Sequence, residues 1–154
     1  MTPSSGPVLF AALALAAAVA AGQSTPERSY IEHVGPPGGK PLPFSDAVLT
    51  GNTLYVAGHL GIDPHTGDAP ADAATEARLV LDAVKQTLER AGFTMDDLVS
   101  VSVYCTDLAL YETFNGIYQT YFHGHHPARA FIGAEKLLRR AHFEVLGVAV
   151  KRTQ

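Results

Sequence analysis

Apolar and polar residues follow two different periods along the chain, and each period predicts its own kind of element. Between residues 71 and 91 apolar side chains recur every three or four positions, which is typical of an amphipathic helix. Asp72 is a suitable N-cap for this helix and Gly92 a natural stop, while Asp107 can cap a second helix. The two apolar faces contain Ala74, Ala77, Leu81, Val84, Leu88 and Ala91 in the first helix, and Phe114, Ile117, Tyr118 and Tyr121 in the second.

Other segments alternate with a period of two, as β-strands do. Residues 46–50 and 53–59 flank the turn residues Gly51-Asn52 and predict a hairpin. Three more strands are predicted at 98–106, 128–134 and 141–151. The order ββαβαββ predicts a single α+β domain, an α/β sandwich with a mixed sheet. Right-handed crossovers are expected to place both helices on one face of that sheet.

The last predicted strand is apolar on both of its faces. Phe143, Val145, Gly147 and Ala149 point one way, whereas Leu146, Val148 and Val150 point the other way together with Glu144. Two helices on one side can cover only the first set. The second face is therefore expected to meet another copy of the chain, with Glu144 in that interface.

Cys105 is the only cysteine, so the chain cannot form an internal disulfide. Val99, Val101 and Val103 are expected to share its face of the strand, which would bury the thiol. A catalytic thiol needs exposure and a neighbouring histidine, so we interpret Cys105 as a core residue.

The N-terminal segment is typical of an export signal. Residues 8–21 form an apolar run that is too short to span a bilayer comfortably, and small residues allow cleavage after Ala20 or Ala21. The first basic side chain is Arg28, so the usual positive n-region is missing. We expect a signal peptide at 1–21, a linker at 22–40, a domain at 41–152, and an exported protein without membrane contact after cleavage. An uncleaved anchor, or a cytoplasmic protein with a misassigned start codon, is the alternative.

Composition excludes some partners. The 154 residues are 47% hydrophobic and 17% charged, as in a compact domain, and the formal net charge is −4. Basic residues form no continuous stripe on any predicted element. The sequence therefore has no electrostatic footprint for nucleic acid.

Arg129 lies in an apolar run, where a charge is costly unless an anion meets it. Its planar fork of donors matches a carboxylate. Glu144, in the next apolar run, can hold or activate water. Alternatively, the two side chains neutralise each other as a structural ion pair. The histidines His123, His125 and His126, with His59 or His142, lack a recognised metal-ligand spacing, and loop histidines are mostly surface residues, so we expect no metal. We interpret His59 as a strand-end residue; a place at the rim of a pocket, with a role in substrate choice, is the alternative.

Several short motifs occur in a characteristic order between Pro41 and Arg152. They are Pro43 to Ala47, Gly51 to Gly58, Ile62 to Gly67, Ala91-Gly92, Val103 to Asp107, Asn115, Tyr118 to Phe122, Pro127 to Arg129, and Glu144. In this order and spacing the chain resembles the RidA/YjgF family of reactive-intermediate deaminases. The ordered set, rather than any single motif, carries the resemblance.

The resemblance implies a chorismate-mutase-like fold and a homotrimer with active sites between subunits. It also implies the hydrolysis of 2-imino acids and their enamine forms to 2-oxo acids and ammonia, without a cofactor. By position, Arg129 is expected to bind the substrate carboxylate and Glu144 to orient or deprotonate water. The backbone at Gly58 is expected to line the same pocket.

Three positions of this expected pocket differ from the family's usual residues. Ala57 stands where a serine is common, Phe44 where a tyrosine is common, and Phe131 where a cysteine is common. Each difference replaces a polar group by hydrocarbon. We therefore expect a bulkier, more apolar substrate, slower turnover, or a trimer that binds small carboxylates without catalysis.

Overall fold

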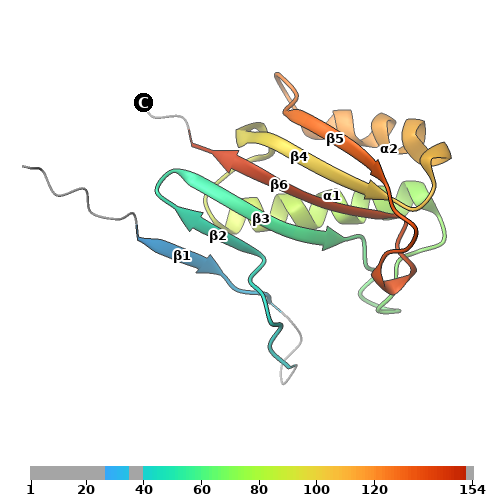
Figure 1. Cartoon of the computed structure of the whole chain (residues 1–154), viewed down its shortest axis with the longest axis horizontal. Helices are drawn as coiled ribbons and strands as arrows, with labels where there is room; N and C mark the ends of the chain where they lie inside the picture. The colour runs from blue at the N-terminus through green and yellow to red at the C-terminus, as the bar shows by residue number, and fades with distance from the viewer. Residues whose placement is uncertain (1–26, 35–39, 152–154) are drawn as a thin grey trace, which may run out of the picture.

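Two helices cover one face of a six-stranded mixed sheet in the computed structural model, which describes residues 27–34 and 40–151 (Figure 1). The helices are α1 (Ala73–Arg90) and α2 (Tyr111–Tyr118). The strands are β1 (Arg28–Ile31), β2 (Ala47–Thr50), β3 (Thr53–Leu60), β4 (Leu98–Cys105), β5 (Ala128–Gly133) and β6 (Phe143–Val150), in the spatial order β1-β2-β3-β6-β4-β5. The pair β4–β5 is parallel, and the other pairs are antiparallel. The predicted order ββαβαββ is confirmed from β2 onward.

The strand β1 lies inside the segment 22–40, for which the sequence indicated a linker. It pairs with β2 at the edge of the sheet, and three of its four side chains are exposed. An edge strand needs little apolar surface, because backbone hydrogen bonds to one neighbour hold it. For that reason hydrophobic patterning does not reveal it.

The helix α1 forms as its periodic sequence predicts. The Asp72 carboxylate accepts a hydrogen bond from the backbone N–H of Thr75 at 2.8 Å, which caps the helix, and Gly92 ends it with φ +78°. The buried stripe includes one charged residue, Glu76, at 0% exposure. Its carboxylate accepts hydrogen bonds from the backbone N–H groups of His142 and Phe143, at 2.6 and 2.8 Å, and so joins α1 to the start of β6.

The second helix begins later than the sequence predicts. The Asp107 carboxylate accepts from the N–H of Ala109 at 2.9 Å and caps a 3₁₀ turn, Leu108–Leu110, rather than α2 itself. Tyr121 lies in another 3₁₀ turn, Gln119–Tyr121, beyond the end of α2. Tight turns of this kind are common at helix ends, where sequence periodicity does not separate them from α-helix.

Strand β4 buries Val101, Val103 and Cys105 against the helices, as predicted. The prediction for Val99 is wrong, because its side chain is 48% exposed. Leu98 pairs with Ala149 while Ser100 pairs with Val148, so Val99 is the extra residue of a bulge. A bulge of one residue moves its side chain off the expected face.

Strand β6 has the two faces that the sequence predicts. Phe143, Val145, Gly147 and Ala149 are buried under the helices, and Glu144, Leu146, Val148 and Val150 are half-buried on the other face. In Figure 1 both helices lie behind the sheet, so this second face is uncovered within the chain. We call it the open face. It also contains Tyr55 and Tyr104, because these residues pair with Val148 and Glu144.

The predicted signal peptide, residues 1–21, lies outside the described residues. In the part of the chain that the structure describes, no helix combines the length and apolar character needed to cross a membrane.

Candidate functional site

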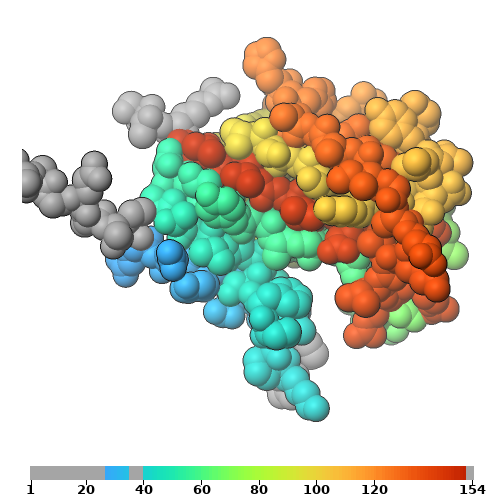
Figure 2. Space-filling view, viewed as in Figure 1, coloured from blue at the N-terminus to red at the C-terminus, as the bar shows by residue number. Residues whose placement is uncertain are grey.

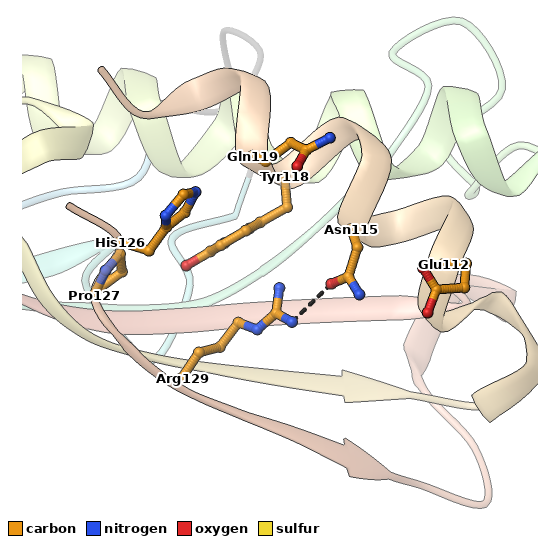
Figure 3. Close-up of a pocket in the computed structure, with 7 residues that line it drawn as sticks. All are labelled: Glu112, Asn115, Tyr118, Gln119, His126, Pro127 and Arg129. Carbon is orange, nitrogen blue, oxygen red and sulfur yellow. Dashed lines mark hydrogen bonds between the residues drawn. The ribbon is translucent and has the colours of Figure 1, made fainter. Parts of the chain in front are cut away.

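Arg129 lies on the edge strand β5, and its side chain points toward the helices. It pairs with the buried Val101 of β4, and paired residues project to the same face of a sheet. The Nη2 atom of Arg129 donates a hydrogen bond to the side-chain oxygen of Asn115 at 2.7 Å (Figure 3). The guanidinium carbon lies 4.5 Å from the centre of the Tyr118 ring, within the range of a cation–π contact. Asn115 and Tyr118, which lie one turn apart on α2, therefore hold the guanidinium of Arg129 in place.

A pocket of about 420 Å³ opens between α2 and β5 at this arginine. Figure 3 shows the residues that line it: Glu112, Asn115, Tyr118, Gln119, His126, Pro127 and Arg129. A guanidinium has five N–H donors, and the bond to Asn115 uses one of them. The remaining donors suit a carboxylate, which accepts two parallel bonds from the planar fork.

Tyr118 adds a hydroxyl group to the same region. The residue is 4% exposed, and its hydroxyl has no hydrogen-bond partner among the described residues. Burial raises the pKa of Tyr118 to about 12, although the charge of Arg129 opposes this shift. The hydroxyl therefore stays protonated at neutral pH. Its ring stacks beside the imidazole of His126, with 6.4 Å between the centroids.

Glu144 lies on the opposite side of the sheet from Arg129. It pairs with Tyr104 of β4 and Leu60 of β3, and its side chain is half-buried on the open face. Within one chain, Arg129 and Glu144 therefore do not form the ion pair that was the alternative interpretation, because the sheet separates them. Arg129 uses Asn115 instead.

Gly58 lies directly beside the Glu144 carboxylate on the open face. A Cβ atom at Gly58 would lie 2.1 Å from the Oε1 atom of Glu144 and 3.1 Å from its carboxyl carbon. The backbone here is close to the carboxylate because β3 has a bulge between Val56 and His59, which contains Ala57 and Gly58. The structure thus brings two of the predicted site residues, Gly58 and Glu144, into direct proximity.

The remaining predicted residues lie elsewhere. Phe131 shares the helix-facing side of β5 with Arg129, and its ring packs against Tyr111 and Phe114 at centroid distances of 5.0 and 5.6 Å. Phe44 is 52% exposed. Its segment, residues 40–44, is exposed and projects from the body of the molecule (Figure 2). One chain therefore holds two separate half-sites: the arginine pocket of Arg129 under α2, and the carboxylate of Glu144 with Gly58 on the open face.

Asn115 and Tyr118 are site residues whose role the sequence did not reveal. Asn115 was only part of a motif, and Tyr118 was expected in the core or an interface. They are three positions apart on α2, a spacing that places two side chains on one face of a helix. That spacing on the helix preceding Arg129 is the signal that could have identified them.

The histidines of the predicted loop and strands have separate partners. His59 contacts Thr87, His123 contacts Asp96, and His142 contacts Glu76, at 2.8, 3.1 and 2.6 Å. Within residues 27–34 and 40–151, no three or more His, Cys, Asp or Glu side chains converge as metal ligands do.

Cys105 is fully buried, as the sequence predicts. Burial raises the pKa of its thiol, so the thiolate form is disfavoured. The Sγ atom lies 3.0 Å from the carbonyl oxygen of Asp107, to which the thiol donates. This environment is that of a structural residue rather than a nucleophile.

These features define a class of small α+β proteins with a carboxylate-matching arginine between an edge strand and a short helix. More specifically, the chain belongs to the RidA/YjgF family, since residues 40–151 match the family described as Endoribonuclease L-PSP. It is 34% identical over 113 residues to the 2-iminobutanoate/2-iminopropanoate deaminase of Escherichia coli K12, covering 71% of this chain and 88% of that protein. It is 35% identical over 114 residues to a RutC family protein of Sulfurisphaera tokodaii, covering 73% and 91% of the two chains.

Solved structures agree with this assignment. The crystal structure of the YjgF gene product from Escherichia coli superimposes with a TM-score of 0.68 at 34% identity, and the match covers 71% of this chain and 89% of that chain. The family match covers both half-sites, since residues 40–151 contain α2, β5, β6 and the bulge of β3.

Proposed function

We propose that the protein is a deaminase that hydrolyses 2-imino acids and their enamine forms to 2-oxo acids and ammonia. The observation that carries this proposal is the arginine pocket, in which Arg129 has one hydrogen bond to Asn115 and further donors for a substrate carboxylate. Family membership supports the same reaction, because a relative at 34% identity is named 2-iminobutanoate/2-iminopropanoate deaminase.

The proposed site requires two copies of the chain. Arg129 and Glu144 lie on opposite faces of one sheet, so one substrate cannot reach both within a subunit. We propose a homotrimer in which the open face packs against a neighbouring copy. Arg129 of one copy would then approach Glu144 and Gly58 of the next. The half-buried apolar residues of the open face, Leu146 and Val148, support an interface of this kind.

The chemistry needs orientation and proton transfer. The C=N carbon of an imine is already electrophilic, so water adds to it once both are held in place. Glu144 takes a proton from the attacking water while the new C–O bond forms, and it passes this proton to the nitrogen as the C=N electrons shift there, which gives a neutral tetrahedral carbinolamine. Glu144 then takes the proton of the new hydroxyl group and delivers it to the nitrogen while the C–N bond breaks, so that the C=O bond of the 2-oxo acid forms and ammonia leaves. Arg129 holds the carboxylate throughout.

The test is the release of 2-oxo acid from freshly generated 2-imino acids with short, branched and aromatic side chains. The purified protein begins near Gln23, and Arg129→Ala is assayed in parallel. Release above the spontaneous rate by the wild type, together with its loss in the variant, is the expected result. A folded protein without acceleration for any side chain would contradict the proposal.

The alternative is a protein that binds small carboxylates without turning them over. The observation in its favour is that the arginine pocket is formed within one subunit, whereas Glu144 lies outside it. Glu144→Gln distinguishes the two functions. A deaminase loses turnover with this variant but still binds a 2-oxo acid, whereas a binding protein shows no turnover before or after the change. The acidic net charge of −4 gives a nuclease activity little support.

A further inference from the structure

The bulge of β3 interrupts the pairing with β6, so contacts other than that ladder hold its shape. Val56 pairs with Gly147 and His59 pairs with Val145, so Ala57 and Gly58 together face a single residue of β6. The N–H of Ala57 donates to the carbonyl oxygen of Asp46 at 2.9 Å, next to the pair Ala47–Val56 of the β2–β3 ladder, so the bulge stays bonded to the β2 side of the sheet. A bulge of this kind changes the direction in which the backbone presents its groups.

His59 joins this bulge to the helix α1. Its Nδ1 atom lies 2.7 Å from the carbonyl oxygen of Ala57, and its Nε2 atom lies 2.8 Å from the hydroxyl oxygen of Thr87. A carbonyl oxygen only accepts, so Nδ1 carries the proton, and in the neutral ring Nε2 accepts from the hydroxyl. Thr87 is 3% exposed on α1 and is fixed by the core around it. Burial lowers the pKa of His59, which favours the neutral ring that this arrangement uses.

The same bulge determines where the Glu144 carboxylate can lie. A Cβ atom at Gly58 would lie 2.1 Å from Glu144 Oε1, so the carboxylate occupies the space beside the glycine backbone. A displacement of the bulge toward Glu144 therefore displaces the carboxylate as well. The contacts run without interruption from Thr87 on α1 through His59 and Ala57 to Gly58 and Glu144.

We propose that His59 is a positioning residue for Glu144: through its bonds to Ala57 and Thr87 it holds the bulge that places Gly58 against the carboxylate. This inference rests on the proposed function, in which Glu144 handles the attacking water. His59 itself does not touch the substrate. Because strands β6 and β4 lie between β3 and the strand β5 that carries Arg129, the loss of His59 affects the step in which Glu144 handles water and leaves carboxylate binding intact.

The experiment compares His59→Leu with His59→Gln, and uses His65→Leu in the exposed loop as the matched control. We expect His59→Leu to lower kcat by about tenfold to a hundredfold, because an error of about 1 Å in a reacting group costs that much. The affinity for a 2-oxo acid is expected to stay within about twofold of wild type. His59→Gln, which can donate and accept through one amide, is expected to restore most of kcat, and the control to match wild type.

A folded His59→Leu protein with wild-type kcat would overturn the inference. Equal loss of kcat and of 2-oxo acid affinity would overturn it too, because that pattern indicates a general structural effect. If His59→Leu does not fold, the double variant His59→Leu/Thr87→Val replaces both partners of the buried hydrogen bond by hydrocarbon and is assayed in its place.

A second readout does not depend on turnover. Hydrogen exchange of the Ala57 amide, which donates to Asp46, is expected to accelerate by about tenfold in His59→Leu and to stay unchanged in His65→Leu. If wild-type protein shows no deaminase activity, the proposed function fails, whereas accelerated exchange still shows that His59 holds the bulge. Unchanged exchange overturns the positioning role whatever the activity.

Discussion

Gly58→Ala places one methyl group directly against the candidate water-handling residue. The new Cβ would lie 2.1 Å from Glu144 Oε1, and real contacts of this kind essentially never fall under 3.0 Å. The carboxylate oxygen must therefore move by the difference between these distances, close to 1 Å. A misplacement of about 1 Å in a reacting group can lower the rate by about a hundredfold. We expect kcat for 2-oxo acid release to fall by one to two orders of magnitude.

The folded state should tolerate the same substitution. The nearest atoms belong to the end of the Glu144 side chain, which can change rotamer, and the backbone of Gly58 is not left-handed. Replacing glycine by alanine also reduces the freedom of the unfolded chain, a gain of about 0.4–1 kcal/mol. We therefore expect the free energy of unfolding to stay within about 1 kcal/mol of wild type.

Gly61→Ala is the matched comparison. Its Cβ would lie 2.4 Å from the backbone oxygen of Glu76 and 3.1 Å from the backbone nitrogen of Val80, so α1 itself must move. Overpacking of this kind costs about 1–3 kcal/mol. Each kcal/mol corresponds to about 4–8 °C in Tm for a domain of roughly 100 residues. We therefore expect a lower Tm for Gly61→Ala, and a lower kcat with little change in Tm for Gly58→Ala.

The assay combines initial rates of 2-oxo acid release with Tm from thermal unfolding, for both variants and wild type. A Gly58→Ala protein with wild-type kcat would refute the role of Glu144 in the rate-determining chemistry. A Gly58→Ala protein that unfolds as readily as Gly61→Ala would refute the premise that only the carboxylate has to move.

Three further predictions concern other parts of the molecule. Asn115→Ala should weaken 2-oxo acid binding by about tenfold in calorimetry, because it removes a charge-assisted hydrogen bond that orients Arg129, and unchanged affinity would contradict this role. Burial lowers the pKa of His59 from its usual 6.5, so the unfolded chain binds a proton more readily than the folded one, and the folded state loses stability as the pH falls from 6.5 toward the lowered pKa. The urea midpoint should therefore drop more between pH 7.5 and pH 5 for wild type than for His59→Gln. Equal drops would contradict this. Leu146→Asp, on the open face, should yield monomers or insoluble protein in size-exclusion chromatography, and a soluble, unchanged oligomer would contradict the interface.

The chain by itself determines most of the local structure. Apolar periods of 3.6 and 2 identified both helices and five of the six strands, because these periods record which side chains face the core. The same alternation in β6 correctly separated the Phe143 face from the Glu144 face. The edge strand β1 and the 3₁₀ turns around α2 were not visible, since neither depends on a repeated apolar face.

The relation between Arg129 and Glu144 was decided only by the tertiary structure. Alternation along each strand predicts which neighbours share a face with Arg129 or with Glu144. Whether these two faces are the same side of the sheet depends on the register in which β5 and β6 each pair with β4. That register, and the bulges at Val99 and at Ala57-Gly58, come from long-range pairing that no local pattern encodes. The sequence therefore identified the two charged side chains, whereas the sheet determined that they face opposite sides and that Asn115 holds the arginine.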